Sequence, residues 1–348
     1  MRASTQPADE FAFAWALDPM VAHMDAALAS RALRVARAVR DPGARARALA
    51  ALSRAVPEKE RPALLEEALT SARSIGDPWR RVRALVPAAS RMPELARETL
   101  AREAFEAAMS IQGDWLRGRA LSMLRRIATA EVHKRALEAA LALKAPNERA
   151  SALSAFAGDL PLDELEGLLA QVESIPDEWL RQSLLASLAG HLPRPALERA
   201  VDLARRLHGT PRALALAELG HALPDWEPAL REDALAEARS LDQPSERAET
   251  LTRLLAGMPE ELRVEPAGEA LAAARAVSDP AVRAALLADL IEFLPEGRVS
   301  EVVGEAGLAA REIVDPILRV ERLSGLIPYL KEAERPAAIG EVLTTFEG

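Results

Sequence analysis

The chain has 348 residues, of which 49% are hydrophobic and only 3% aromatic, so alanine, leucine and valine must supply the core, and helices are favoured over strands. The formal net charge of −9 argues against nucleic-acid binding, and the lack of cysteine excludes disulfides, thiolate metal sites and thiol catalysis. No apolar run approaches the roughly 20 residues that cross a bilayer, and Asp9 and Glu10 precede the first apolar patch, unlike in a signal peptide. We therefore expect a cytoplasmic protein that does not bind membranes.

Residues 1–19 lack the pattern that fills the rest of the chain, and we expect them to form an N-terminal cap segment. From residue 20 to residue 348 one sequence motif recurs: an aliphatic anchor, often followed by Asp-Pro, then Arg, then Leu, then an apolar-Pro pair. A fixed period of this kind is the signature of a repeat protein, so residues 20–348 are predicted to form a single repeat domain. The anchors, 32–36 residues apart, are Val39, Ile75, Ile111, Leu143, Ile175, Leu207, Leu241, Val277 and Ile313.

Each repeat reads as two helices, which we call helix A and helix B. Asp-Pro after the anchor, as at Asp41-Pro42 and Asp279-Pro280, places an N-cap acceptor before a proline at the first helical position. Helix A then runs to an apolar-Pro pair, with Pro224 at this place in the sixth repeat, and helix B returns to the next anchor. One leading helix and nine pairs give an expected total of nineteen helices.

Two short helices cannot bury both of their faces alone, so each pair must stack on the next. We predict an all-α fold, an α-solenoid of about nine stacked helix pairs that follows a right-handed superhelix or arc. The repeat length resembles that of tetratricopeptide repeats, although no repeat contains W-x2-L-G-x2-Y. The Asp-Pro turn followed by Arg resembles a HEAT repeat, with a shorter Asp-to-Arg gap than usual. Similar arrays occur in bacterial signalling proteins; the resemblance is architectural and carries over no functional residue.

An arginine six residues after the anchor recurs in eight repeats, on the same face as the core leucine at +10. In one interpretation it is a structural ladder, in which each arginine pairs with the Asp cap or with the last carbonyls of the preceding helix B. In the other it is a cationic ladder for an anionic ligand. We favour the structural ladder, because every repeat shares the residue. Its members are Arg45, Arg81, Arg117, Arg149, Arg181, Arg247, Arg283 and Arg319, with Arg212 as the shifted copy in the sixth repeat.

Three tryptophans, Trp79, Trp115 and Trp179, stand four residues after their anchors, about 150° from the centre of the buried stripe of helix A. Either they cover the turn of a neighbouring repeat, or they form an aromatic ridge that anchors a partner. We take them as the candidate partner-binding residues. Trp115 and Trp179 belong to repeats in which helix B is about one turn shorter, so a notch or a change of curvature is expected at that edge between residues 129 and 207.

Nothing in the sequence points to catalysis, a metal or a cofactor. The five histidines form no HExxH motif, and no nucleophile elbow or phosphate-binding glycine loop occurs. We therefore expect no enzyme activity, no catalytic residue, no metal site and no cofactor.

The sequence favours a non-catalytic scaffold or sensor module that presents an extended curved surface to another protein or peptide. One alternative is a helical-repeat enzyme. Its active site would need polar residues that depart from the repeat pattern and converge at one place, and we identify no such residues in the sequence. The other is a nucleic-acid-binding solenoid, which the net charge disfavours unless the arginines two residues before the anchors line one face. These are Arg37, Arg73, Arg205, Arg239, Arg275 and Arg311.

Overall fold

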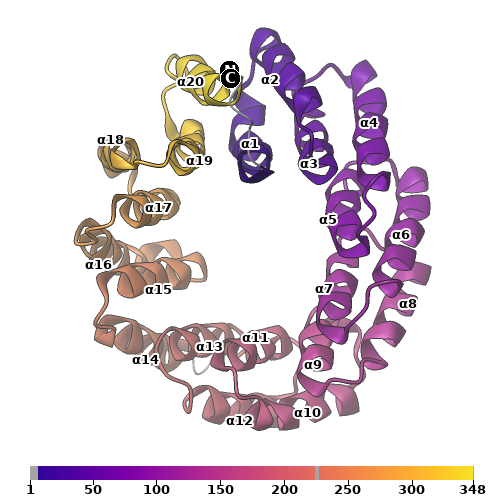
Figure 1. Ribbon diagram of the computed structural model, residues 1–348. Helices are drawn as coiled ribbons and strands as arrows, with labels where there is room; N and C mark the ends of the chain where they lie inside the picture. Colours follow the sequence, from indigo (N-terminus) through magenta and orange to yellow (C-terminus); the bar gives the residue numbers. More distant parts are fainter. Residues whose placement is uncertain (1–6, 224–226, 348) are drawn as a thin grey trace. The chain divides into compact units, whose positions relative to one another are not determined.

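The computed structural model describes residues 7–223 and 227–347, and within these ranges the chain is all-α, with 20 α-helices that pack in sequential pairs, consistent with a helical-repeat arrangement (Figure 1). Residues 1–6 of the predicted cap segment and Pro224 lie outside the described residues. The nineteen predicted helices are present, and the twentieth is α1, Pro7–Met20, in the segment expected to be a cap. None of the described helices is long and apolar enough to cross a bilayer.

Helices alternate between the A and B positions of the repeats after a leading helix α2, Ala26–Ala38. The A helices are α3 Pro42–Leu52, α5 Pro78–Ala89, α7 Asp114–Leu124, α9 Pro146–Ser154, α11 Glu178–Ala189, α13 Gly209–Ala222, α15 Pro244–Ala256, α17 Pro280–Leu290 and α19 Pro316–Leu326. The B helices are α4 Arg61–Arg73, α6 Glu94–Met109, α8 Ala130–Leu141, α10 Leu162–Gln171, α12 Arg194–Ala204, α14 Glu227–Ser240, α16 Val264–Arg275, α18 Glu296–Glu312 and α20 Arg335–Phe346. Short 3-10 turns are Val21–His23, Glu58–Glu60, Ala157–Asp159, Val172–Ser174, Glu260–Leu262, Ile291–Phe293 and Ile327–Tyr329.

The Asp-Pro pairs begin the A helices as predicted. The Asp41 carboxylate accepts hydrogen bonds from the backbone N–H groups of Gly43 and Ala44, at 2.8 and 2.9 Å. These N–H groups have no partner inside the helix, so the cap satisfies donors that burial would otherwise leave unpaired. The same side-chain cap is present at Asp77, Asp177, Asp279 and Asp315.

The chain divides into two compact units, and the predicted repeat domain runs through both. The first compact unit contains residues 1–138 and 300–348, and the second contains residues 139–299. In the first, α3, α5 and α7 pack in succession, and α1 continues this row between α3 and α19 (Figure 1). We call α19, α1, α3, α5 and α7 the A layer. Helices α2, α4, α6, α8 and α20 form the B layer; α4 and α6 pack on α3 and α5, and α20 packs on α2.

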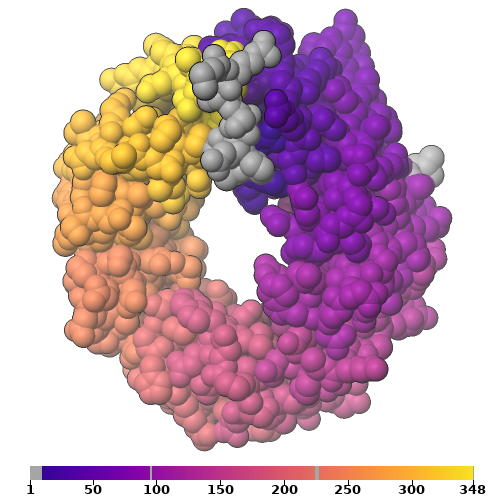
Figure 2. All heavy atoms as spheres, in the orientation of Figure 1, coloured from indigo at the N-terminus to yellow at the C-terminus, as the bar shows by residue number. Residues whose placement is uncertain are grey.

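The first and last described helices meet inside the first compact unit, where indigo and yellow atoms adjoin (Figure 2). The rings of Phe13 on α1 and Phe346 on α20 lie 5.2 Å apart between centroids. Arg31 on α2 forms an ion pair with Glu347 and donates a hydrogen bond to Thr344 at 2.8 Å. Helix α1 therefore has A-layer neighbours on both sides, α3 and α19.

The second compact unit repeats the same packing, with α9, α11, α13, α15 and α17 in succession. In both units the core consists of alanines and leucines, and Leu49, Leu121 and Leu251 at the +10 position have no exposed surface. Helices α8, α10 and α12 have 12, 10 and 11 residues, against 16 in α6 and 17 in α18 but only 13 in α4 and 12 in α16, so helix length alone does not set the central repeats apart and the predicted shortening stays a prediction. The notch expected over residues 129–207 involves both compact units and stays a prediction.

Candidate binding surface

The arginines at +6 are half-buried and most of them contact backbone at the junction of helix B with the next helix A. Arg81 donates to the carbonyl of its anchor Ile75 at 2.8 Å, and Arg319 donates to that of Ile313 at 3.0 Å. The anchor carbonyl follows the end of helix B and has no partner within that helix, so the guanidinium acts as a C-terminal cap. The same bond is made by Arg45, Arg117, Arg247 and Arg283. Arg181 instead contacts Glu178 at 3.3 Å, and Arg212 contacts Glu237 at 3.2 Å.

Four of the six arginines at −2, which would have to be free for nucleic-acid binding, pair with acids on the neighbouring B helix. Arg37 and Glu67 lie 3.0 Å apart, and Arg239 and Glu269 lie 2.9 Å apart. In each pair the acid stands eight residues before the following anchor. The same register produces Arg73–Glu103 at 2.9 Å and Arg205–Asp233 at 3.4 Å. These pairs neutralise Arg37, Arg73, Arg205 and Arg239.

Two of the three predicted tryptophans lie together on the A layer. The Trp115 side chain on α7 is 59% exposed, and Trp79 on α5 is half-buried. The guanidinium carbon of Arg119 is 5.4 Å from the ring centroid of Trp115 and 5.8 Å from that of Trp79, within the range of cation–π attraction. Arg83 approaches the Trp79 ring at 5.8 Å. The result is an alternating row of arginine and tryptophan across α5 and α7.

The third predicted tryptophan belongs to the second compact unit. Trp179 on α11 is 49% exposed, and the Arg253 guanidinium of α15 lies 5.6 Å from its ring centroid. None of the three tryptophans is fully buried between repeats. Trp79 and Trp115 therefore form one candidate surface, and Trp179 is a separate exposed aromatic.

The sequence analysis missed a set of arginines that break the repeat pattern. Arg47, Arg83 and Arg119 all stand eight residues after their anchors, and only in the first three repeats. Five later repeats have Ser151, Ser183, Glu249, Ala285 and Glu321 at this position. The expectation that no polar residues converge against the repeat is thus wrong, and comparing the +8 position between repeats would have shown it.

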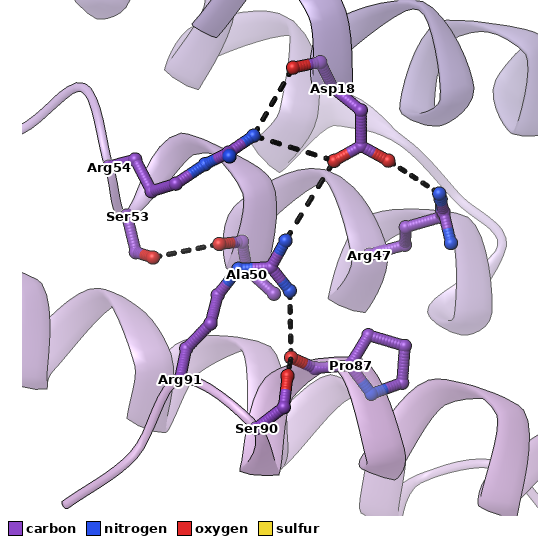
Figure 3. A network of polar contacts seen from close by, with 8 residues as sticks. All are labelled: Asp18, Arg47, Ala50, Ser53, Arg54, Pro87, Ser90 and Arg91. Carbon is purple, nitrogen blue, oxygen red and sulfur yellow. Dashed lines mark hydrogen bonds and ion pairs between the residues drawn. The ribbon is translucent and has the colours of Figure 1, made fainter. Parts of the chain in front are cut away.

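Asp18 on α1 is the carboxylate to which three arginines converge (Figure 3). Arg47 Nη2 lies 2.5 Å from Asp18 Oδ2, while Arg54 and Arg91 approach Oδ1 at 3.7 and 3.8 Å. Arg54 also donates to the Asp18 carbonyl at 3.2 Å, and Arg91 donates to the Pro87 carbonyl at 2.7 Å. One negative charge is thus shared among three guanidinium groups.

Burial and the neighbouring positive charges change the pKa values of the arginines in this cluster. Burial lowers the pKa of Arg47, and the nearby Arg83 and Arg126 lower it further, while Asp18 opposes both effects. Burial likewise lowers the pKa of Arg91. Arg83 and Arg126 are exposed, and neither has a carboxylate within ion-pair distance in the part of the chain that the structure describes. The surface therefore keeps an excess of positive charge.

Arg47, Arg83 and Arg126 line a pocket of about 200 Å³ between α1, α3, α5 and α7, which we call the arginine pocket. Four guanidinium groups and a set of apolar side chains face it. The arginines are Arg47, Arg80, Arg83 and Arg126, and the larger apolar residues are Phe11, Trp15, Pro87 and Met123. Arg80 also pairs with Asp41, and the Arg47 guanidinium lies 3.5 Å from the Trp15 ring centroid.

Guanidinium groups stay protonated at neutral pH and offer forked donors to carboxylates and phosphates. The arginine pocket is therefore suited to binding an anion and not to transferring a proton. Among the described residues, no group of three or more His, Asp or Glu is arranged to hold a metal ion.

Neither a family model nor a curated protein sequence matches the chain. Among solved structures, that of Ton1535 from Thermococcus onnurineus NA1 is similar at a TM-score of 0.33 with 14% identity, over 84% of this chain and 94% of that chain. A TM-score of this size shows neither a shared fold nor a shared function, so the function is argued from this chain's own residues.

Proposed function

We propose that this protein is a non-catalytic interaction scaffold, an α-solenoid of tetratricopeptide/HEAT-like type, that binds an acidic segment of a protein or peptide partner through the A layer of its first compact unit. The contrast between the two layers carries the proposal. In the B layer, arginines such as Arg37 and Arg73 are paired with glutamates. In the A layer, Arg83 and Arg119 contact tryptophan rings and no carboxylate of the described chain.

The chemistry of the A layer suits a mixed acidic and apolar partner. Exposed Trp115 offers a large apolar contact, and Arg119 beside it offers a fork for a carboxylate. Tryptophan and arginine are the residues that most often dominate the energy of protein interfaces. Because the whole chain carries −9, this local positive surface attracts an acidic segment and not a long polyanion.

A nucleic-acid function has less support. Binding a strand requires a continuous track of unpaired cations along the backbone of the nucleic acid. The recurring arginines that would supply such a track are those at −2, and Arg37, Arg73 and Arg239 are held by glutamates.

Site-specific photocrosslinking in the native host tests the scaffold. A photoreactive residue at Met123, in the arginine pocket, is expected to capture a distinct protein, and one at Glu98 on the B-layer helix α6 is not. The double variant Arg83→Glu, Arg119→Glu should abolish the adduct at position 123. Lys134→Glu, a charge reversal on α8 with 79% of its side chain exposed, is the matched control and should retain it.

Equal adducts at positions 123 and 98, or an adduct that survives the double reversal, would overturn the proposal. A pure peptide pair provides a second readout. A fluorescein-labelled octaglutamate peptide should bind the wild-type protein more tightly than the double variant, whereas octaserine, which has no charged side chain, should bind neither.

A further inference from the structure

The arginine pocket holds more positive charge than the neighbouring carboxylates neutralise: Asp18 pairs with Arg47, and Asp41 pairs with Arg80. Asp18 is already shared among Arg47, Arg54 and Arg91. Arg83 and Arg126 add two more charges with no ion-pair partner in the described residues. Crowded like charges oppose folding, so a cluster of this kind is expected where an anion binds.

The pocket still has hydrogen-bond donors that the described chain leaves unused. The guanidinium of Arg83 donates no hydrogen bond to a described acceptor, and neither does that of Arg126. A ligand with several acceptor oxygens would satisfy donors of this kind.

The arrangement of the guanidinium groups favours a tetrahedral anion. Arg47 comes from α3, Arg83 from α5, and Arg126 follows the end of α7, so the groups reach the same pocket from three separate helices. A planar carboxylate is satisfied by the fork of one arginine. A phosphate group has three terminal oxygens and accepts hydrogen bonds from several directions at once.

We propose that the arginine pocket binds a dianionic phosphomonoester. Its source is a phosphorylated side chain of the partner, in which case the inference rests on the proposed function, or a small phosphorylated molecule, in which case it does not. The pocket volume of about 200 Å³ is below the roughly 300 Å³ at which pockets for whole drug-sized ligands begin. It therefore accommodates the phosphate and the group that carries it, with Phe11, Trp15 and Met123 in contact with that group.

Calorimetric titration with phenyl phosphate, at pH 7.5 and low salt, tests the pocket directly. Benzoate is the matched ligand, because it carries the same ring on a singly charged planar carboxylate. We expect phenyl phosphate to bind at least tenfold more tightly than benzoate. At pH 5 the affinity should fall, because the second pKa of a phosphomonoester is about 6 and the ligand loses a charge.

The double variant Arg83→Gln, Arg126→Gln should weaken phenyl phosphate at least tenfold, as expected for the loss of charged hydrogen bonds. Lys134→Gln in the B layer should leave the affinity unchanged, and thermal melts should show that all the proteins are folded. The inference is overturned if benzoate binds as tightly as phenyl phosphate, if the double variant binds like the wild type, or if no heat is detected at millimolar phenyl phosphate.

A last pair of measurements separates this inference from the proposed function. The peptide Gly-Gly-phosphoserine-Gly-Gly and its unphosphorylated form are compared as competitors of the crosslink at position 123. Competition by the phosphopeptide alone supports a phosphorylated partner. If phenyl phosphate binds but neither it nor the phosphopeptide reduces the crosslink, the source is a small molecule. If the crosslink forms but neither phenyl phosphate nor the phosphopeptide binds, the proposed scaffold function is retained and the proposed phosphate site is overturned.

Discussion

Arg37 on α2 and Glu67 on α4 form a forked ion pair, in which Nε and Nη2 of the arginine both contact the carboxylate, at 3.0–3.2 Å. Arg73–Glu103 and Arg239–Glu269 reproduce the same fork between other B helices. Each arginine lies two residues before an anchor, and each glutamate lies eight before the next. The hydrogen bonds that Arg37 and Arg73 donate to Glu67 and Glu103 raise the pKa of each arginine. The repeat length therefore specifies how one B helix is joined to the next.

A double-mutant cycle on Arg73 and Glu103 is expected to give a coupling free energy of about 0.2–1 kcal/mol, because both side chains are partly exposed and the solvent screens the pair. The coupling should shrink in 1 M NaCl, where the Debye length is about 3 Å. Chemical denaturation of the four proteins measures it. The pair Glu98 and Arg102, within α6, is the control and should show a similarly small value. A coupling that is large and independent of salt contradicts this account.

The repeat was predictable because its signals are local. The cap at Asp41 and the hydrogen bond from Arg81 to Ile75 involve residues at most six apart, so spacing alone predicts them. The position of α1 has no such signal, since Phe13 meets Phe346 from the other end of the chain. The arginine pocket is predictable only in part. The +8 arginines can be recognised from their spacing in the sequence, whereas the ion pair between Asp18 and Arg47 forms only through tertiary packing.

Replacing Arg283 by Ala should destabilise the protein by about 1.5–3 kcal/mol, because a charged donor to two carbonyls is lost. Its guanidinium donates to the carbonyl of Val277 at 2.9 Å and to that of Ser278 at 3.1 Å. Urea denaturation followed by circular dichroism measures the change. Arg206→Ala, which removes a side chain that is 66% exposed, should change the free energy of unfolding by no more than about 0.5 kcal/mol. Equal effects of the two variants would contradict the structural role of the +6 arginine.

The contact between the chain ends should depend on pH. The hydrogen bond from Arg31 lowers the pKa of Glu347 below its ordinary value of 4.5. A carboxyl whose pKa is lower in the folded state stabilises that state above the unfolded pKa and loses the effect as the pH falls through the folded pKa. Hydrogen exchange of the α20 amides should therefore be constant from pH 7 to about pH 5, after correction for the intrinsic exchange rate, and protection should decrease below pH 4.5. Glu347→Gln should remove most of this decrease. If the variant shows the same pH dependence, another group is responsible.

Alanine variants of Trp79 and Trp115, the two predicted tryptophans of α5 and α7, should distinguish effects on stability from effects on binding. Trp115 is 59% exposed, so Trp115→Ala should change the free energy of unfolding by less than about 0.5 kcal/mol. Trp79 is half-buried, so Trp79→Ala should lower the free energy of unfolding by more than Trp115→Ala does. Burial of apolar surface stabilises the folded state by about 25 cal/mol per Å², and the truncation removes part of that buried surface. Both changes remove a ring beside Arg119, so both should reduce the crosslink at position 123, by at least tenfold if these rings are interface hot spots.

Trp179→Ala is the matched control for this prediction, because it removes a ring that is 49% exposed from the second compact unit. It should leave the crosslink at position 123 unchanged. A loss of the crosslink in all three variants would show that the tryptophans act together, as the sequence pattern first suggested, and that the surface extends beyond α5 and α7. A loss in none of them, with the Arg83→Glu, Arg119→Glu variant still inactive, would assign the binding to charge alone and remove the aromatic part of the proposal.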